Sequence, residues 1–390
     1  MDERLKKAVD WIDANRTQML SLWERLVQTD SPTTEKAGAD RVAQLLADAL
    51  RDAGAEVELV ANVQRGDLLH AEWGRDNPGR PVIFTGHMDT VFPAGETAER
   101  PFRIEDGRAY GPGVLDMKGG LTAAVFALRA LKEAGFRGRP VRVLFVGDEE
   151  SGHRFSDSKA LYLRLAQGAA AALNFETGFE DGGIVTNRKG CARFRLEVTG
   201  VEAHSGNAAN LGRSAIREMA HKILALEALS DPAAGLNVSV GTITGGTVVN
   251  AIPGFCKVEV DVRYLTQEQM ERTLEAARLI SGTCYTDGCT CRMLKQTPDL
   301  PMPESEGNLR LFSVVAKAAE TLGAQPVHPM GVGGWSDSNL LASIGIPVVC
   351  AMGVQGKYNH TKREYAVVES LFARAGLAAA TVIGLEHWEE

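Results

Sequence analysis

The sequence lacks long hydrophobic runs and a dense set of cysteines. No apolar stretch in the 390 residues approaches the ~18–20 residues that a membrane-spanning helix needs, so no membrane partner is predicted. The first residues also lack the apolar segment and cleavage site of a secretory signal. Six cysteines in so long a chain do not suggest the disulfide framework of a small secreted domain. We therefore expect a reduced, cytoplasmic protein.

The chain is also short of basic charge. It carries 42 Lys and Arg against 50 Asp and Glu, a net charge of −8. No basic stripe could neutralise phosphates, so a nucleic acid partner is not expected. Hydrophobic residues make up 44% of the chain, enough to fill a substantial core without disulfides or metals. At ~100–200 residues per domain, this length suggests two domains, with three as the alternative.

Compact apolar runs bounded by glycine or proline predict the strands of a buried sheet. These runs occupy residues 81–85, 141–146, 170–175 and 347–352. Apolar residues at helical spacing predict helices over residues 4–27, 38–53 and 119–134. Strands that are apolar on both faces are typical of covered sheets. We therefore expect an α/β domain with a mixed sheet flanked by helices.

A segment of different character interrupts this pattern. Apolar and charged residues alternate along residues 193–198 and 257–264, which is typical of a sheet with one solvent-exposed face. Together with two helical segments, these strands give the order β-α-β-β-α-β of a ferredoxin-like unit. We predict that residues 1–187 and 300–390 form one domain and that residues 188–299 form an inserted α+β domain.

Five loops carry ligand-type side chains, and four of them directly follow a predicted strand. The candidates in these loops are His87, Asp89, Asp116, Glu149, Glu150, Glu176 and His360. Because ligands in open α/β sheets bind beyond the carboxyl ends of the strands, we expect the loops to converge on one crevice. Imidazole with carboxylate is a zinc ligand set, and the number of carboxylates suggests more than one metal. A bridging carboxylate suits two ions ~3.5–4 Å apart.

The spacing of neighbouring candidates separates their roles. His87 and Asp89 are two residues apart, so in an extended segment their side chains leave on the same face. Asp89 can then accept a hydrogen bond from the non-ligating nitrogen of His87. Glu149 and Glu150 are neighbours that point differently, so one can bind metal while the other handles the proton of the attacking water.

Each candidate alone has a simpler explanation. His87 by itself would more often be a structural histidine, and Asp116 would cap the helix that begins near residue 119. Glu149 and Glu150 would form a solvated charge pair. The joint pattern of five loops, each with ligand chemistry, favours a metal site over these explanations.

The motifs around these residues resemble those of a known family. This is the di-zinc metallopeptidase family of glutamate carboxypeptidase, aminoacylase, peptidase T and succinyl-diaminopimelate desuccinylase. The similar segments are His87-Met-Asp89-Thr-Val, Gly-Val-Leu-Asp116-Met-Lys-Gly-Gly, Asp-Glu149-Glu150-Ser-Gly, Phe-Glu176-Thr and His360. The resemblance runs from about residue 10 to 385 and is strongest to the bacterial glutamate carboxypeptidase branch. It implies a zinc-peptidase catalytic domain with an inserted dimerisation domain.

The resemblance also implies a ligand set. It implies two Zn²⁺ per subunit, with Co²⁺ or Mn²⁺ as alternatives. By the resemblance, Asp116 would bridge the two ions. His87 and Glu176 would complete one site. Glu150 and His360 would complete the other.

The inserted segment contributes three further residues to the resemblance. His204, Asn250 and Arg263 stand in motifs similar to the family's own. These imply a homodimer through the inserted domain, in which His204 reaches the partner subunit's active site and polarises the scissile carbonyl. Arg263 and Asn250 would hold the free α-carboxylate of the substrate, although Arg263 alone is also explained as part of a solvated sheet face. Trp335 departs from the family pattern and places an aromatic ring near the expected substrate channel.

These expectations define a zinc-dependent hydrolase of amide bonds. It would release a C-terminal amino acid, with glutamate as the candidate, from a peptide or N-acyl amino acid by means of metal-bound hydroxide. Glu149 would act as general base and then as general acid, and Asp89 would support His87. An N-acyl-amino-acid deacylase would use the same ligands and is the alternative. A non-catalytic binding protein on this scaffold is a further alternative, but the presence of Glu149 argues against it.

Overall fold

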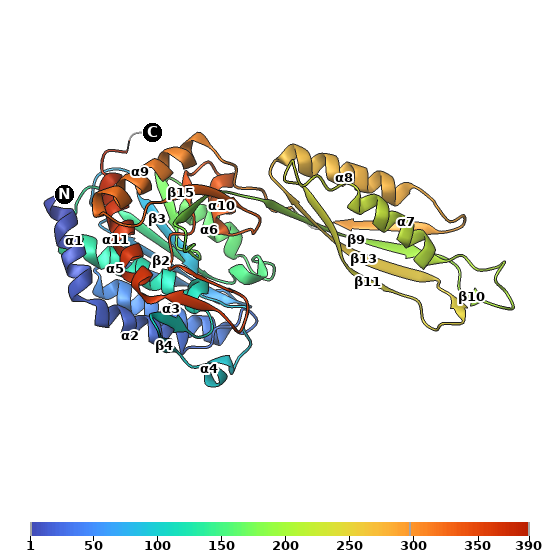
Figure 1. Cartoon of the computed structure of the whole chain (residues 1–390), viewed down its shortest axis with the longest axis horizontal. Helices are drawn as coiled ribbons and strands as arrows, with labels where there is room; N and C mark the ends of the chain where they lie inside the picture. The colour runs from blue at the N-terminus through green and yellow to red at the C-terminus, as the bar shows by residue number, and fades with distance from the viewer. Residues whose placement is uncertain (1, 296–297, 389–390) are drawn as a thin grey trace. The chain divides into compact units, whose positions relative to one another are not determined.

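The computed structural model of the chain describes residues 2–295 and 298–388, which form two compact units (Figure 1). Unit 1 contains the described residues of Met1–Asn187, Glu304–Gly331 and Ser336–Glu390, and unit 2 contains those of Arg188–Pro303 and Val332–Trp335. No helix in the described ranges is long and apolar enough to cross a membrane. All six cysteines lie in these ranges, and none forms a disulfide there. The cytoplasmic location stays a prediction.

A six-stranded mixed sheet forms the centre of unit 1. Its strands, in sheet order, are β1 (Glu56–Val60), β2 (Gly66–Trp73), β6 (Val141–Gly147), β3 (Val82–His87), β7 (Ala171–Asn174) and β16 (Val348–Val349). The last four run parallel, while β1 and β2 add an antiparallel edge. β3 is buried along its whole length, as expected for a central strand with helices on both faces.

Helices cover this sheet and complete the core of unit 1. They are α1 (Glu3–Ala14), α2 (Arg16–Val27), α3 (Lys36–Asp52), α5 (Gly119–Glu133), α6 (Ser158–Ala166), α9 (Glu306–Leu322), α10 (Asp337–Ser343) and α11 (Val368–Gly384). The hydrophobic helix α5 contacts β3, α1 and α11, so almost all of its residues are buried.

The smaller elements of unit 1 lie in its loops. They are α4 (Glu96–Glu99), β4 (Arg103–Glu105), β5 (Arg108–Tyr110), β8 (Gly183–Arg188), β15 (His328–Val332), β17 (Gly356–Lys357) and β18 (Tyr365–Val367), of which β8 and β15 reach its boundary with unit 2. A separate small sheet has the order β17-β18-β5-β4. It joins the segment before the Asp116 loop to the segment that carries His360.

One helix predicted from the sequence is two helices in the structure. The spacing of apolar residues predicts a single helix over residues 4–27, but the structure interrupts it at Asn15, between α1 and α2. The Asn15 side-chain amide donates a hydrogen bond to the Trp11 carbonyl at 2.7 Å, and its backbone leaves the helical region. Asparagine side chains compete with the helix for backbone hydrogen bonds, which explains the break. The predicted mixed sheet flanked by helices is confirmed.

Unit 2 contains a four-stranded antiparallel sheet and two helices. In chain order these are β9 (Gly190–Thr199), α7 (Ala215–Glu227), β11 (Asn237–Gly245), β13 (Phe255–Tyr264), α8 (Gln267–Gly282) and β14 (Thr290–Lys295). The sheet order β11-β13-β9-β14 is that of a ferredoxin-like unit, as predicted.

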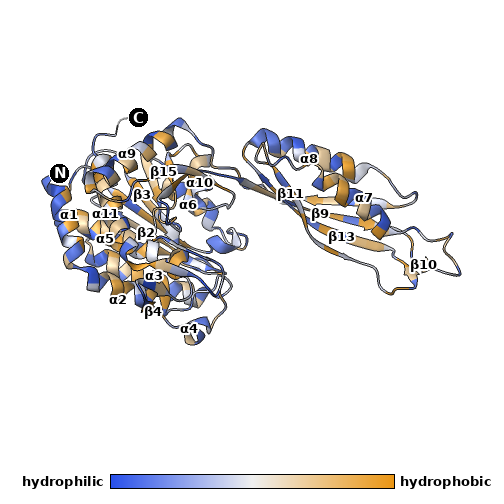
Figure 2. Ribbon diagram, in the orientation of Figure 1, coloured by the Kyte–Doolittle hydropathy of each residue, from blue (hydrophilic) through white to orange (hydrophobic). Residues whose placement is uncertain are grey.

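The sheet of unit 2 is apolar on one face only. Buried residues alternate with half-exposed ones along β9 and β13, and Figure 2 shows hydrophobic and hydrophilic residues mixed along these strands. The helices α7 and α8 contact the sheet and bury its apolar side chains. A short ladder of β10 (Ala203–His204) and β12 (Ala251–Ile252) lies beyond the paired ends of β9 and β13.

Candidate active site

Three parallel strands of unit 1 end at the same edge of the sheet, and ligand-type residues stand at or just after each end. β3 ends at His87, and Glu176 stands two residues after the last residue of β7. The turn after β6 carries Glu149 and Glu150. Loops from other parts of the chain add two more candidates to this edge, Asp116 and His360. The structure therefore brings the predicted residues of unit 1 together.

Asp116 lies at the centre of this group. One of its carboxylate oxygens is 3.1 Å from His87 Nε2, and the other is 3.1 Å from His360 Nε2. Burial alone would raise the pKa of Asp116, but the hydrogen bonds with the two imidazoles outweigh it and hold the pKa well below its usual range. Asn359 also donates to the second oxygen at 3.1 Å. A carboxylate with one oxygen facing each histidine has the arrangement that a bridge between two metal ions requires.

The other ligand candidates lie on either side of Asp116. Glu150 Oε1 is 3.3 Å from His360 Nε2, and Glu176 Oε1 is 3.7 Å from His87 Nε2. One ligand atom each from His87, Asp116 and Glu150 lies within 4.8 Å of the others. Burial raises the pKa of Glu150. The arrangement gives each histidine a carboxylate of its own in addition to the shared one.

These residues fit a bound metal ion. Imidazoles and carboxylates are the donors that zinc and related divalent ions take in proteins. Glu150 Oε1 is buried without a hydrogen-bond partner among the described residues, since its contact with His360 is an ion pair only. A divalent cation would satisfy this oxygen and offset the repulsion between closely packed carboxylates. The group is therefore a candidate metal site by its donor chemistry.

Glu149 lies beside the ligand candidates in a different environment. It begins the short 3₁₀ turn Glu149–Ser151 and is buried. Burial raises the pKa of Glu149 well above its usual value, and the carboxylates of Glu176 and Asp337 raise it further. One carboxylate oxygen of Glu149 also lies within 4.8 Å of ligand atoms of His87 and Glu176. A carboxyl group with a raised pKa next to a candidate metal site is suited to take up and return a proton.

Asp89 contacts His87 through its backbone carbonyl as well as its carboxylate. His87 Nδ1 lies 3.0 Å from the Asp89 backbone carbonyl and 3.5 Å from its carboxylate, so the carbonyl is the nearer acceptor. The carboxylate instead accepts the backbone N–H groups of Glu149 at 3.2 Å and Glu150 at 3.1 Å, and the Thr33 hydroxyl at 2.7 Å. Asp89 thus orients the ring of His87 and also fixes the backbone that carries Glu149.

Glu364, which no sequence motif indicates, supports the site. Its buried carboxylate accepts the backbone N–H groups of Gly113 at 3.2 Å, Leu115 at 2.8 Å and Asp116 at 2.9 Å. Burial raises the pKa of Glu364 to about 7. Because Glu364 stands four residues after His360, it ties the loop of one ligand candidate to the loop of another. Its hydrogen-bond partners are backbone groups, so residue types gave no sign of this role. The only signal in the sequence is the position of Glu364, four residues after His360.

His204 of unit 2 is exposed and has a defined tautomer. It lies in β10, at one tip of unit 2 (Figure 1). Its Nδ1 accepts hydrogen bonds from the backbone N–H groups of Gly206 and Asn207, each at 3.1 Å. A neutral imidazole that accepts at Nδ1 carries its proton at Nε2. His204 therefore offers an Nε2–H donor at the surface of this unit.

Arg263 and Asn250 lie far apart within unit 2. Arg263 pairs with Cys191 near one end of β13, whereas Asn250 stands next to β12, beyond the other end. The eight residue steps from Phe255 to Arg263 alone span ~26 Å at ~3.3 Å per residue. Within one chain, the two side chains therefore cannot contact the same carboxylate. The sequence motifs carry no information on strand direction, so they could not show this.

Comparison with known proteins decides the family. Residues 83–383 match the family described as Peptidase family M20/M25/M40. The chain belongs to this family. As a member of M20/M25/M40, it is a hydrolase of peptide or amide bonds, and the family resemblance seen in its motifs is confirmed.

Relatives in M20/M25/M40 cover nearly the whole chain. Carboxypeptidase G2 of Pseudomonas sp. (strain RS-16) is 28% identical over 368 residues, which are 93% of this chain and 88% of that protein. A succinyl-diaminopimelate desuccinylase of Nitrobacter hamburgensis is 30% identical and covers 91% of this chain and 95% of its own length. The structure of aminopeptidase PepT from Bacillus cereus has a TM-score of 0.79 at 24% identity, covering 95% of this chain and 99% of its own. The similarity to the PepT structure supports the fold.

Proposed function

We propose that this M20/M25/M40 hydrolase binds two zinc ions and releases a C-terminal amino acid, with glutamate as the candidate, from a peptide or N-acyl amino acid. The observation that carries the proposal is the position of Asp116 between His87 and His360, with one carboxylate oxygen for each. The ions, with Co²⁺ or Mn²⁺ as alternatives, would be held by His87, Asp116, Glu150, Glu176 and His360. When bound, they would lower the pKa of a shared water toward ~7 and polarise the scissile carbonyl. Release of a free amino acid by metal-loaded protein, and none by chelator-treated protein, tests the proposal.

Glu149 supplies the proton transfers in this proposal. It takes the proton of the attacking water and returns it to the leaving amine. An ordinary carboxyl group holds such a proton weakly, whereas burial and the neighbouring carboxylates raise the pKa of Glu149. The hydrogen bond from the Glu149 N–H group to Asp89 keeps the base in place during both transfers.

A second copy of the chain supplies His204 in this proposal. As charge develops on the carbonyl oxygen, the exposed Nε2–H group would donate a hydrogen bond to it. The contacts of Nδ1 with Gly206 and Asn207 hold the ring in the tautomer that this role requires. The separation of Asn250 from Arg263 within one chain supports a site that draws residues from two copies.

The edge strand β11 and helix α7 are the proposed surface for this second copy. β11 is an outer strand of the unit 2 sheet, and edge strands can pair with another chain. Large apolar side chains are exposed on or next to these two elements at Ile216, Leu224, Ile243, Val248 and Val249. An apolar surface beside an edge strand is typical of a subunit interface.

The dimer proposal predicts the mass of the protein in solution. Size-exclusion chromatography with light scattering should give about twice the chain mass of 41.9 kDa. The double variant Leu224→Asp, Ile243→Lys should give the chain mass, because it places charges on the proposed apolar interface. Leu279→Asp is the matched control, since Leu279 is exposed on α8 and should leave the dimer intact. A single-chain mass for the unaltered protein would contradict the dimer.

Arg263 is the candidate for binding the α-carboxylate of the substrate. Its Nε donates to Asp261 at 2.7 Å, which orients a guanidinium group that can bind a carboxylate through two nitrogens. Arg263→Ala should raise KM by ~10–100-fold with little change in kcat, because a charge-assisted contact made equally in substrate and transition state is lost. Arg193→Ala is the matched control, since Arg193 also donates to Asp261, at 2.9 Å. An unchanged KM in Arg263→Ala would refute the assignment.

An N-acyl-amino-acid deacylase is the second candidate function. The relative from Nitrobacter hamburgensis, a desuccinylase by name, is 30% identical to this chain. Both candidates cleave the amide bond between an acyl group and the nitrogen of an amino acid, so they differ in the acyl side of the substrate. Rates on acetyl, succinyl and aminoacyl derivatives of one amino acid separate them.

A further inference from the structure

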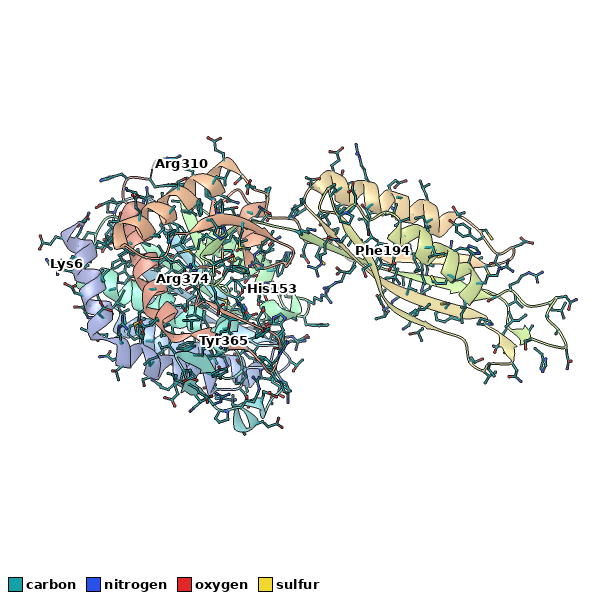
Figure 3. The ribbon with its side chains drawn as sticks, in the orientation of Figure 1. Lys6, His153, Phe194, Arg310, Tyr365 and Arg374 are labelled. Atoms are coloured by element: carbon teal, nitrogen blue, oxygen red, sulfur yellow. The ribbon has the colours of Figure 1, made fainter. Side chains whose placement is uncertain are left out.

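His153 is a buried histidine that no predicted role uses. It follows Glu149 by four residues, and Figure 3 labels it among the side chains of unit 1. Its Nδ1 lies 2.8 Å from Asp148 Oδ1, and its Nε2 lies 2.7 Å from Asp337 Oδ1. The ring and both carboxyl groups are buried. His153 therefore forms a closed bridge between the residue before Glu149 and the start of α10.

The positions of the two carboxylates define the charge of the His153 ring. A neutral imidazole donates from one nitrogen only, whereas both nitrogens of His153 face carboxylate oxygens. The ring is therefore an imidazolium that donates to both. Burial alone would lower the pKa of His153, but the carboxylates of Asp337 and Asp148 outweigh it and raise the pKa well above its ordinary value. Charge-assisted hydrogen bonds of this kind are stronger than neutral ones.

The backbone around His153 is folded to place its ring in this position. His153 has a φ of 54°, in the left-handed region that residues other than glycine rarely adopt. Its N–H group donates to the Asp148 carbonyl at 3.2 Å, and the Gly152 N–H group donates to the Glu149 carbonyl at 2.6 Å. Such conformations persist where the surroundings determine them, and they concentrate at functional sites. The turn formed by residues 148–153 therefore contains Glu149.

Asp337 is a buried carboxylate in contact with His153. It is the first residue of α10, and its Oδ1 lies 2.7 Å from His153 Nε2. Its Oδ2 is buried without a hydrogen-bond partner among the described residues. His153 Nε2 forms an ion pair with Asp337, so loss of the ring would leave a buried charge without this cationic partner.

The turn that carries Glu149 is held from two sides. On one side, Asp89 accepts the Glu149 N–H group. On the other side, the imidazolium of His153 joins Asp148 to a separate helix through Asp337. We propose that His153 is a positioning residue, which fixes the general base Glu149 by clamping Asp148 against Asp337.

This inference rests on the proposed function, since Glu149 is a general base only in that proposal. A positioning role for His153 has different consequences from those of an ion pair that only stabilises the fold. An ion pair that only stabilises the fold would lower the melting temperature without a selective effect on kcat. A clamp that positions the base lowers kcat more than KM, because its effect is felt in the transition state.

The variant His153→Asn removes the side-chain bridge without disturbing the backbone conformation of residue 153. Asparagine tolerates the left-handed region, but its side chain is too short to reach both carboxylates. We expect wild-type metal content, a nearly unchanged KM and a kcat lower by ~10–100-fold, as is usual for residues that orient an active-site group. His70→Asn is the matched control, because His70 also pairs with a carboxylate, Glu72 at 3.2 Å, and should keep wild-type kcat. A wild-type kcat in His153→Asn overturns the inference.

A double variant tests the charge balance. His153→Asn leaves the buried charge of Asp337 without its imidazolium partner, whereas His153→Asn combined with Asp337→Asn removes that charge. The double variant should therefore recover part of the lost kcat. A merely structural contact would not require the imidazolium charge. A double variant no more active than His153→Asn therefore contradicts a role for that charge.

Hydrogen exchange of the metal-free protein gives a readout without activity. In His153→Asn, residues 147–155 should exchange faster than in the wild type, while β3 should exchange at the same rate. Unchanged exchange in residues 147–155 overturns the inference. If the wild-type protein hydrolyses no substrate, the proposed function fails, and the exchange result still decides whether His153 holds this turn.

Discussion

Glu149→Gln is expected to lower kcat by ~10²–10⁴-fold while the metal site stays loaded. Glutamine has the size of glutamate but cannot take up the proton of the attacking water. The ligand candidates around Asp116 are unchanged by this substitution, so the metal content should match the wild type. Elemental analysis and steady-state kinetics on the same preparation measure both quantities.

Glu150→Gln is the matched control for this prediction. Glu150 is the neighbouring carboxylate, and its buried Oε1 lies 3.3 Å from His360 Nε2. Its substitution should lower metal content and turnover together, because it removes a ligand oxygen. Full turnover in Glu149→Gln would show that another group transfers the proton. Loss of metal in that variant would make Glu149 a ligand instead of the base.

His204→Ala is expected to lower kcat by ~10²–10³-fold, the usual cost of losing one hydrogen-bond donor to a developing oxyanion. The metal content should stay unchanged, since His204 belongs to unit 2 and the ligand candidates belong to unit 1. The dimer should also persist, because Ile243 and Leu224 are not altered. Kinetics, elemental analysis and light scattering measure these three properties.

Mixed dimers test whether His204 acts across the subunit interface. A dimer of one Glu149→Gln chain and one His204→Ala chain contains one site in which an intact Glu149 meets an intact His204 from the other chain. Such dimers, made by coexpression with two affinity tags, should regain the turnover of one site per dimer. Mixed dimers as inactive as either parent would contradict a role for His204 in the partner subunit's site.

The ligand candidates could be predicted because their chemistry follows from local sequence. β3 and β7 are short apolar runs, and His87 and Glu176 stand at or just after their ends. Parallel strands place these ends at one edge, so strand prediction alone brings the side chains together. Asp116 and His360 were assigned through the motif resemblance, and the structure places both in the same group.

Other features could not be predicted because they depend on distant or backbone partners. Glu364 binds three backbone N–H groups more than 240 residues earlier in the chain, and these groups leave no trace in residue types. His153 has its decisive partner, Asp337, 184 residues away. The separation of Arg263 from Asn250 depends on strand direction in unit 2, which the motifs do not contain.

The most direct test of the central proposal measures amino-acid release from matched substrates. A panel of dipeptides and N-acyl amino acids, varied only at the C-terminal residue, is incubated with zinc-loaded protein and with chelator-treated protein. We expect metal-dependent release of the C-terminal amino acid, with a preference for one side chain such as glutamate, and recovery of activity when zinc is restored. Equal release with and without metal, or no release from any substrate by protein that holds two zinc ions, would contradict the account.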